Sequence, residues 1–190
     1  MTGIERGFEQ VEVPKEEQEL LARFFHNSYI KTNFTPDGDP SASIRRKEGG
    51  RPKGGESPEE LFDFRTTPFS SLTDFWKKDN LAAAQAALTA VYGRIEKVKN
   101  SEAVDSPRVA THNTDFIESA AEDVHKAFIK RRGIDNVPVE QRVDYGDLKN
   151  DPKTGRDLKD LDRDQVRAAI EIWQLGIDGF KEKHKEDLVL

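Results

Sequence analysis

The residues best suited to bind a ligand lie in the last third of this chain. His125 is next to the apolar stripe of a predicted helix, where an imidazole can contact a ligand or change its charge near neutral pH. Guanidinium groups form paired hydrogen bonds with phosphate or carboxylate oxygens, and a tyrosine ring offers a flat face to a planar group. We expect these groups to converge if the last two helices pack together. The candidate ligand-binding residues are His125, Arg131, Arg132, Arg142, Tyr145 and Arg163.

The same residues also have structural interpretations. An imidazole at the edge of a core can simply hydrogen-bond to the backbone, and this description fits His125. Lys130-Arg131-Arg132 complements the negative end of a helix dipole. Trp173, whose ring could stack near a ligand, has the spacing of a core residue. The sequence leaves both interpretations open.

A second group of cations lies in a glycine-rich segment. Gly49-Gly50-Arg51-Pro52-Lys53-Gly54-Gly55 has the glycines of a phosphate-binding loop but lacks its Gly-Lys-Ser/Thr ending. This basic segment is either an arm that binds an anionic partner or a nucleotide phosphate, or a solvated loop that keeps the chain soluble. The candidate residues of this basic loop are Arg45, Arg46, Lys47, Arg51 and Lys53.

The sequence shows no pattern of metal-binding or catalytic residues. The four histidines lack the helical spacing of a zinc site, and there is no cysteine. Asp37-Gly38-Asp39 and Asn150-Asp151 lack the ligand positions of a calcium-binding loop. No nucleophile has an identifiable base, and no carboxylate stands in an apolar setting that would raise its pKa. We therefore expect no metal and no cofactor, and a binding role is favoured over catalysis.

Charge and length restrict the class of protein. The chain has 190 residues and a net charge of −6, with 35% hydrophobic and 35% charged residues. An acidic balance argues against nucleic-acid binding. No apolar run approaches the roughly 20 residues of a membrane-spanning helix, and no secretory signal follows Met1. We expect a cytoplasmic protein, or one carried by a virion if it is phage-encoded.

Apolar periodicity predicts a mainly α, compact helical domain. Helices are expected near residues 14–28, 81–98, 115–132 and 158–175, and shorter ones after Ser57 and from Ser70 or Ser71 to Lys78. Ser57 and Glu60 can form a capping box, Asp79 or Asn80 can cap the helix at 81–98, Thr114 can cap the helix at 115–132, and Gly133 ends it. Residues 35–57 lack periodicity and predict a long irregular, mobile loop. The segment 134–157 alternates loosely between apolar and polar residues, which is compatible with a short β-hairpin between the last two long helices.

The main predicted boundary is a polar linker at 100–113. It divides a helical, loop-rich region, residues 1–110, from a helical module, residues 111–190. Residues 81–92 carry no charge, so they are buried in the core or form a contact between subunits of a homo-oligomer. Seven of the eleven phenylalanines lie between Phe24 and Phe75. They either fasten irregular backbone onto the helix at 81–98 or form an interface.

Residues 115–177 resemble the ryanodine-receptor-type (RyR) repeat domain, which also occurs in bacterial and phage proteins. The resemblance rests on Ile117-Glu118-Ser119-Ala120-Ala121-Glu122-Asp123-Val124-His125-Lys126-Ala127-Phe128, Arg131-Arg132, Tyr145-Gly146-Asp147-Leu148 and Leu161-Asp162-Arg163-Asp164-Gln165. Phe128 stands where the family commonly has tryptophan. The resemblance implies a helical pair with a small strand element, and a binding or sensing module without catalytic residues.

These observations predict a non-catalytic module that binds a small anionic ligand, such as a nucleotide-like molecule, or a protein partner. A structural subunit of a phage or multiprotein assembly is the alternative, with residues 81–92 and the phenylalanine-rich stretch as its contact surfaces. An enzyme of unknown class is a third alternative.

Overall fold

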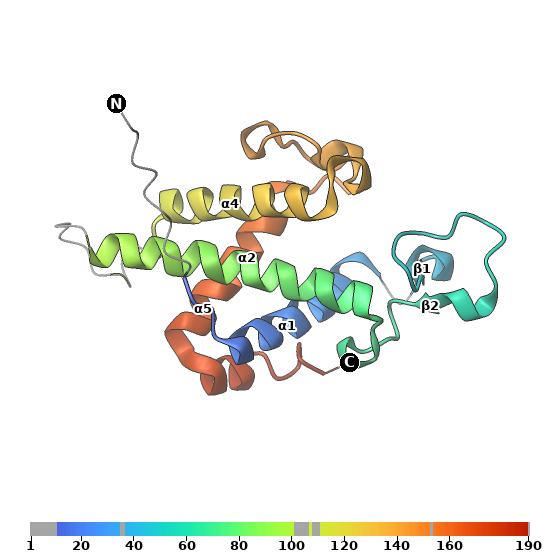
Figure 1. Ribbon diagram of the computed structural model, residues 1–190, viewed down its shortest axis with the longest axis horizontal. Helices are drawn as coiled ribbons and strands as arrows, with labels where there is room; N and C mark the ends of the chain where they lie inside the picture. Colours follow the sequence, from blue (N-terminus) through green and yellow to red (C-terminus); the bar gives the residue numbers. More distant parts are fainter. Residues whose placement is uncertain (1–10, 35–36, 101–106, 108–110, 153, 190) are drawn as a thin grey trace, which may run out of the picture.

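A computed structural model describes residues 11–34, 37–100, 107, 111–152 and 154–189. Within these residues the fold is built from four long helices, α1 (Lys15–Asn33), α2 (Asp74–Lys99), α4 (Thr114–Arg132) and α5 (Lys159–Lys183), shown in Figure 1. The prediction of a mainly α domain is confirmed. The linker predicted at 100–113 lies largely outside the described residues.

Helix α2 is longer than the sequence predicts. We expected a short helix ending at Lys78 and a second one capped by Asp79 or Asn80, but the helix runs through both residues. No proline or glycine interrupts this stretch. Asn80 donates its side-chain amide to the carbonyl of Trp76 (2.8 Å), one turn earlier, and Asp79 forms ion pairs with another helix. Both side chains that resemble caps therefore have other partners.

The ends of α4 and α5 follow local sequence signals. Asn113, rather than the expected Thr114, caps α4, because its side-chain oxygen accepts from the backbone N–H of Asp115 (2.8 Å). Gly133 ends α4 as predicted, with φ of 73°. Helix α5 is interrupted at Gly176, where φ is 69° and ψ is 175°, so its first straight part stops where the predicted helix stopped.

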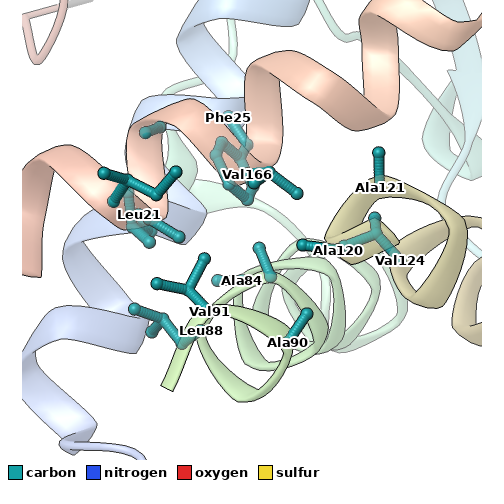
Figure 2. Packing of buried hydrophobic residues seen from close by; sticks show 14 of the residues in the cluster. Leu21, Phe25, Ala84, Leu88, Ala90, Val91, Ala120, Ala121, Val124 and Val166 are labelled. Atoms are coloured by element: carbon teal, nitrogen blue, oxygen red, sulfur yellow. The ribbon is translucent and has the colours of Figure 1, made fainter. Parts of the chain in front are cut away.

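The four helices share one apolar core, seen in Figure 2. Fully buried alanines, such as Ala84 on α2 and Ala120 and Ala121 on α4, let the helix backbones approach closely. Leu21 of α1 and Val166 of α5 complete the centre of this cluster. The core thus joins residues from both sides of the predicted boundary at 110.

The uncharged segment 81–92 contributes much of this core. Ala84, Ala87, Leu88, Ala90 and Val91 are all buried within the single chain. Packing inside one molecule therefore accounts for the lack of charge, which is the first of the two interpretations that the sequence allowed. A homo-oligomer formed through this segment stays a prediction.

A two-stranded antiparallel sheet joins β1 (Ile44–Arg46) to β2 (Leu61–Asp63). Strand β1 follows the short 3-10 helix η1 (Pro40–Ser43), so the stretch expected to be irregular contains two ordered elements. The predicted capping box after Ser57 is confirmed, because Glu60 accepts from the Ser57 backbone N–H (2.7 Å). It starts only the 3-10 helix η2 (Pro58–Glu60), and the expected helix beyond it is a strand.

The hairpin is fastened to α1 and α2 by a second apolar cluster. This cluster consists of the buried side chains of Ile30 on α1, Trp76 on α2, and Phe64 and Leu72 from the segment before α2. The rings of Phe64 and Trp76 meet edge to face, with 5.1 Å between their centres. Phe34, Phe62 and Phe69 pack around this cluster. Much of the phenylalanine-rich stretch therefore packs within the chain.

The connector between α4 and α5 consists of three 3-10 helices, η4 (Ile134–Asn136), η5 (Val139–Gln141) and η6 (Tyr145–Asp147). Its only strand-like pairing in the described residues is an isolated antiparallel bridge between Asn150 and Asp157. The short sheet of this fold is therefore the β1–β2 pair, which precedes α2 in the chain, and the described residues of the connector form no hairpin of their own. None of the helices in the described part of the chain combines the length and apolar character needed to cross a membrane.

Candidate ligand-binding site

A cavity of about 370 Å³ is lined by the start of α2, the second half of α4, the start of α5 and the β1–β2 hairpin. The start of α2, the end of α4 and the hairpin lie at the right of Figure 1. The polar lining of the cavity includes Arg45, Arg51, Asp79, His125, Arg131 and Arg132. The apolar lining includes Phe25, Phe64, Trp76 and Phe128. Both the volume and this mixed lining are typical of small-molecule sites.

Asp79 of α2 holds two arginines at the end of α4. Its Oδ1 lies 3.1 Å from Nε of Arg131, and Nε and Nη2 of Arg132 donate to its two oxygens. Burial raises the pKa of Asp79, but the two guanidinium groups outweigh burial and keep that pKa below its ordinary value. The carboxylate therefore stays charged and fixes both arginines.

Arg131 lines the cavity and keeps two guanidinium nitrogens that no described residue uses. Asp79 uses only its Nε, so Nη1 and Nη2 have no acceptor among the residues that the structure describes. Phe128 supports the group from one turn earlier: the guanidinium carbons of Arg131 and Arg132 lie 5.7 and 5.3 Å from its ring centre. A guanidinium held in this way can bind a carboxylate or phosphate through two parallel hydrogen bonds.

His125 and Asp162 form a buried pair in the cavity wall. Nδ1 of His125 lies 3.1 Å from Oδ2 of Asp162, and its Nε2 lies 2.9 Å from the carbonyl oxygen of Val143. A carbonyl only accepts, so Nε2 must carry a hydrogen. Nδ1 of a neutral ring is then an acceptor, and the contact with the carboxyl group requires a further proton between these two atoms.

That shared proton explains the pKa directions of the pair. Burial opposes a charge on His125, but hydrogen bonds to Asp162 and Val143 outweigh it and raise the pKa of His125. Burial also raises the pKa of Asp162, although His125 counteracts it. Both shifts favour keeping one proton between the two side chains. Since both ring nitrogens are engaged, His125 has no nitrogen left for a ligand in this arrangement.

Three of the predicted ligand-binding residues lie outside the cavity lining and have other partners. Tyr145 is buried and donates to Glu118 (2.8 Å), which also binds Nε of Arg163 (2.6 Å). Arg163 further pairs with Asp157 (2.9 Å) and Asp160. These contacts tie α4, η6 and the start of α5 together.

Arg142 holds the connector in place instead of facing the cavity. Its Nε donates to the carbonyl oxygen of Val137 (2.8 Å), and its Nη2 donates to that of Asp135 (3.1 Å). The structure thus brings His125, Arg131 and Arg132 to one cavity. It places Arg142, Tyr145 and Arg163 in neighbouring structural contacts.

The predicted basic loop also divides. Arg45 and Arg51 line the cavity, whereas Arg46, Lys47 and Lys53 do not. The backbone of two of them is used in packing: the Arg46 carbonyl accepts from Trp76 (3.0 Å) and the Lys47 carbonyl from Thr73 (2.8 Å). From the sequence, the basic loop and the α4 arginines are two separate candidate sites. In the structure, Arg45 and Arg51 of the loop line the same cavity as Arg131 and Arg132 of α4.

Neither carboxylate of the site stands out in the sequence. Asp79 has the position of a helix cap, and Asp162 belongs only to the motif that resembles the repeat family. Gln141 and Gln165, two half-buried amides in the same wall, do not stand out either. Within the described residues, no three histidine, aspartate or glutamate side chains are grouped so that they could hold a metal ion.

Comparisons of the chain with protein-family models, with curated proteins and with solved structures found no match. The resemblance to the ryanodine-receptor-type repeat therefore stays a prediction.

Proposed function

We propose that this protein is a non-catalytic module that binds a small anionic ligand in the cavity between α2, α4 and the hairpin. The observation that carries the proposal is the Nη1–Nη2 edge of Arg131, which is positioned by Asp79 and Phe128 but has no protein acceptor among the described residues. A preorganised guanidinium loses little side-chain freedom on binding, which favours affinity for an anion.

The charge of the cavity supports an anionic ligand. Four arginines line it, against the carboxylates of Asp79 and Asp162, and Asp162 shares a proton with His125. This cationic excess stands in a chain with a net charge of −6. A concave surface of one charge sign concentrates ligands of the opposite sign.

The remaining wall supports a ligand with an apolar or planar body. Phe25, Phe64, Trp76 and Phe128 contribute aromatic carbon, and Gln141 and Gln165 contribute amides that can donate and accept. A nucleotide-like molecule belongs to this class, as does an aromatic carboxylate.

Isothermal calorimetry with inorganic phosphate, phenyl phosphate and benzoate tests the proposal. Arg131→Gln is compared with Arg167→Gln, whose arginine forms an exposed ion pair with Asp164 outside the cavity lining. We expect Arg131→Gln to weaken binding at least about tenfold, because a charge-assisted hydrogen bond is lost, and Arg167→Gln to bind as the wild type does. Equal affinities for the two variants, both folded, would refute the proposed site.

A protein partner is the second candidate, favoured by exposed apolar side chains on the connector. Val139 is 71% exposed, Ile134 48% and Val143 38%. If the connector binds a partner, a Val139→Ser variant should lose that partner and keep its affinity for anions. Light scattering tests the alternative of a structural subunit, which should assemble into higher oligomers.

A further inference from the structure

Arg45 is a buried arginine, only 6% exposed. It forms no ion pair with a carboxylate in the described part of the chain. Its Nη1 donates to the carbonyl oxygens of Ala42 (2.7 Å) and Ile44 (2.9 Å). The rings of Phe34 and Phe64 lie 5.6 and 5.8 Å from its central carbon.

These contacts leave the charge of Arg45 largely uncompensated. Arginine is rarely buried unless it is paired, because removing a full charge from water is costly. Carbonyl oxygens and aromatic faces supply only partial negative charge, and both carbonyls contact the same nitrogen. Nε and Nη2 of Arg45 have no acceptor among the described residues. The cavity is the space beside this group, since Arg45 forms part of its wall.

Arg51 adds a second cation to the same side of the cavity. It lies in the segment between β1 and β2, it is exposed, and it has no ion-pair partner in the described residues. Arg45 and Arg51 belong to the hairpin, whereas Arg131 belongs to α4. The cavity therefore has two cationic walls from segments far apart in the sequence, and Asp79 neutralises only the one on α4.

We infer that the ligand is a small organic dianion with two separate anionic groups. One group binds the free edge of Arg131, the second binds Arg45 and Arg51, and an apolar middle packs on the aromatic wall. This inference rests on the proposed function and adds a requirement that a single anion would not meet. It also makes the hairpin part of the binding site.

Calorimetry on the full chain tests this inference with matched pairs of probes. Succinate, adipate, suberate and terephthalate are compared with the monocarboxylates of the same carbon skeletons, and 1,4-phenylene bisphosphate is compared with phenyl phosphate. We expect at least one probe with two anionic groups to bind about tenfold more tightly than its partner with one such group, the gain of one charge-assisted contact. Arg45→Met should remove this difference and leave the affinity for the probe with one anionic group within about twofold.

Arg51→Gln and Lys53→Gln provide a second pair of variants that does not depend on a core substitution. Both residues are exposed and lie in the same segment, but only Arg51 lines the cavity. Arg51→Gln should reduce the preference for the dianion, and Lys53→Gln should not. If Arg45→Met does not fold, this pair and the wild-type ratio of affinities decide the question.

The outcomes separate this inference from the proposed function. Probes with one and with two anionic groups could bind equally well, with affinities that Arg131→Gln weakens and that Arg45→Met and Arg51→Gln leave unchanged. This result would refute a ligand with two anionic groups and would leave the proposed anion site intact. No binding of any probe would overturn both.

Discussion

His125 and Asp162 share a single proton inside the cavity wall, because the carbonyl of Val143 fixes which ring nitrogen carries the other hydrogen. The pair joins the middle of α4 to the first turn of α5, and Val143 adds the connector. Three segments that surround the proposed site therefore depend on one hydrogen-bonded chain.

Substitutions of His125 and of Asp162 should lower the stability of the protein by unequal amounts. His125→Ala leaves a buried carboxyl group without a partner, and we expect the free energy of unfolding to fall by about 3 kcal/mol. Asp162→Asn should cost less than about 1.5 kcal/mol, because the new amide can donate to Nδ1 of a neutral His125. Urea unfolding measures both values. Equal losses for the two variants would contradict a shared proton.

The raised pKa of His125 predicts a loss of stability on the alkaline side. The contribution of this group is fully present below the ordinary histidine value of 6.5 and is lost as the pH rises through the higher folded-state pKa. The free energy of unfolding should fall above about pH 6.5, by no more than about 1.4 kcal/mol per pH unit. His125→Gln keeps a donor for Val143 but does not titrate. A wild-type curve parallel to that of His125→Gln between about pH 6 and pH 9 would disprove the assignment.

His26 predicts the opposite change on the acid side. It is fully buried, its Nε2 donates to the carbonyl of Thr67 (2.8 Å), and its Nδ1 has no hydrogen-bond partner among the described residues. Burial lowers the pKa of His26, and the hydrogen bond to Thr67 only partly opposes it. Its contribution is present above 6.5 and is lost as the pH falls through the lower folded-state pKa.

The acid-side prediction is tested by His26→Gln, whose amide can still donate to Thr67. The difference in unfolding free energy between the wild type and this variant should shrink as the pH falls from about 6.5 to about 5. A difference that stays constant over this range would show that His26 does not titrate differently in the folded and unfolded chains.

Local patterns predicted most of the helices but not their continuity. Apolar periodicity marks a helix from its own residues, and Gly133 signals an end in the same local way. The break expected at Asp79 was wrong, because the partners that occupy this carboxylate, Arg131 and Arg132, lie 52 and 53 residues further along the chain. Strand β1 was missed for a similar reason: its pairing with β2 joins segments separated by the glycine-rich loop.

Three of the six predicted ligand-binding residues, His125, Arg131 and Arg132, line the cavity, but their partners could not be predicted. Phe128, Arg131 and Arg132 are three and four residues apart, so their clustering on one face follows from helix geometry. Which acid each arginine meets depends on tertiary packing, and local sequence does not specify it. Arg163 could have faced a ligand, but Glu118 and Asp157 bind it instead.

Asp79 should matter more for stability than an exposed acid does. It is largely buried between two arginines, so Asp79→Asn leaves their charges uncompensated, and we expect a loss of about 1–3 kcal/mol in the free energy of unfolding. Asp164→Asn, which breaks an exposed pair with Arg167, should cost less than about 0.5 kcal/mol. Chemical unfolding of the two variants at one pH compares them. A smaller loss for Asp79→Asn than for Asp164→Asn would argue against a stabilising role for the ion pairs of Asp79 with Arg131 and Arg132.

Gly176 should tolerate a side chain in space but not in backbone conformation. A Cβ at this position would meet no atom within 4 Å, yet φ is 69° and ψ is 175°. Such a conformation costs a non-glycine residue about 1–3 kcal/mol, so Gly176→Ala should lower the free energy of unfolding by about that amount. Gly146 is the matched control, because its surroundings are equally open and its φ is not positive. Gly146→Ala should change stability by less than about 0.5 kcal/mol.

If Gly176→Ala were instead neutral or stabilising, α5 would have straightened through this point, because alanine favours a continuous helix. The kink would then not be a fixed feature of the fold. Circular dichroism distinguishes these outcomes, since a straightened α5 gains helical signal and a strained kink does not.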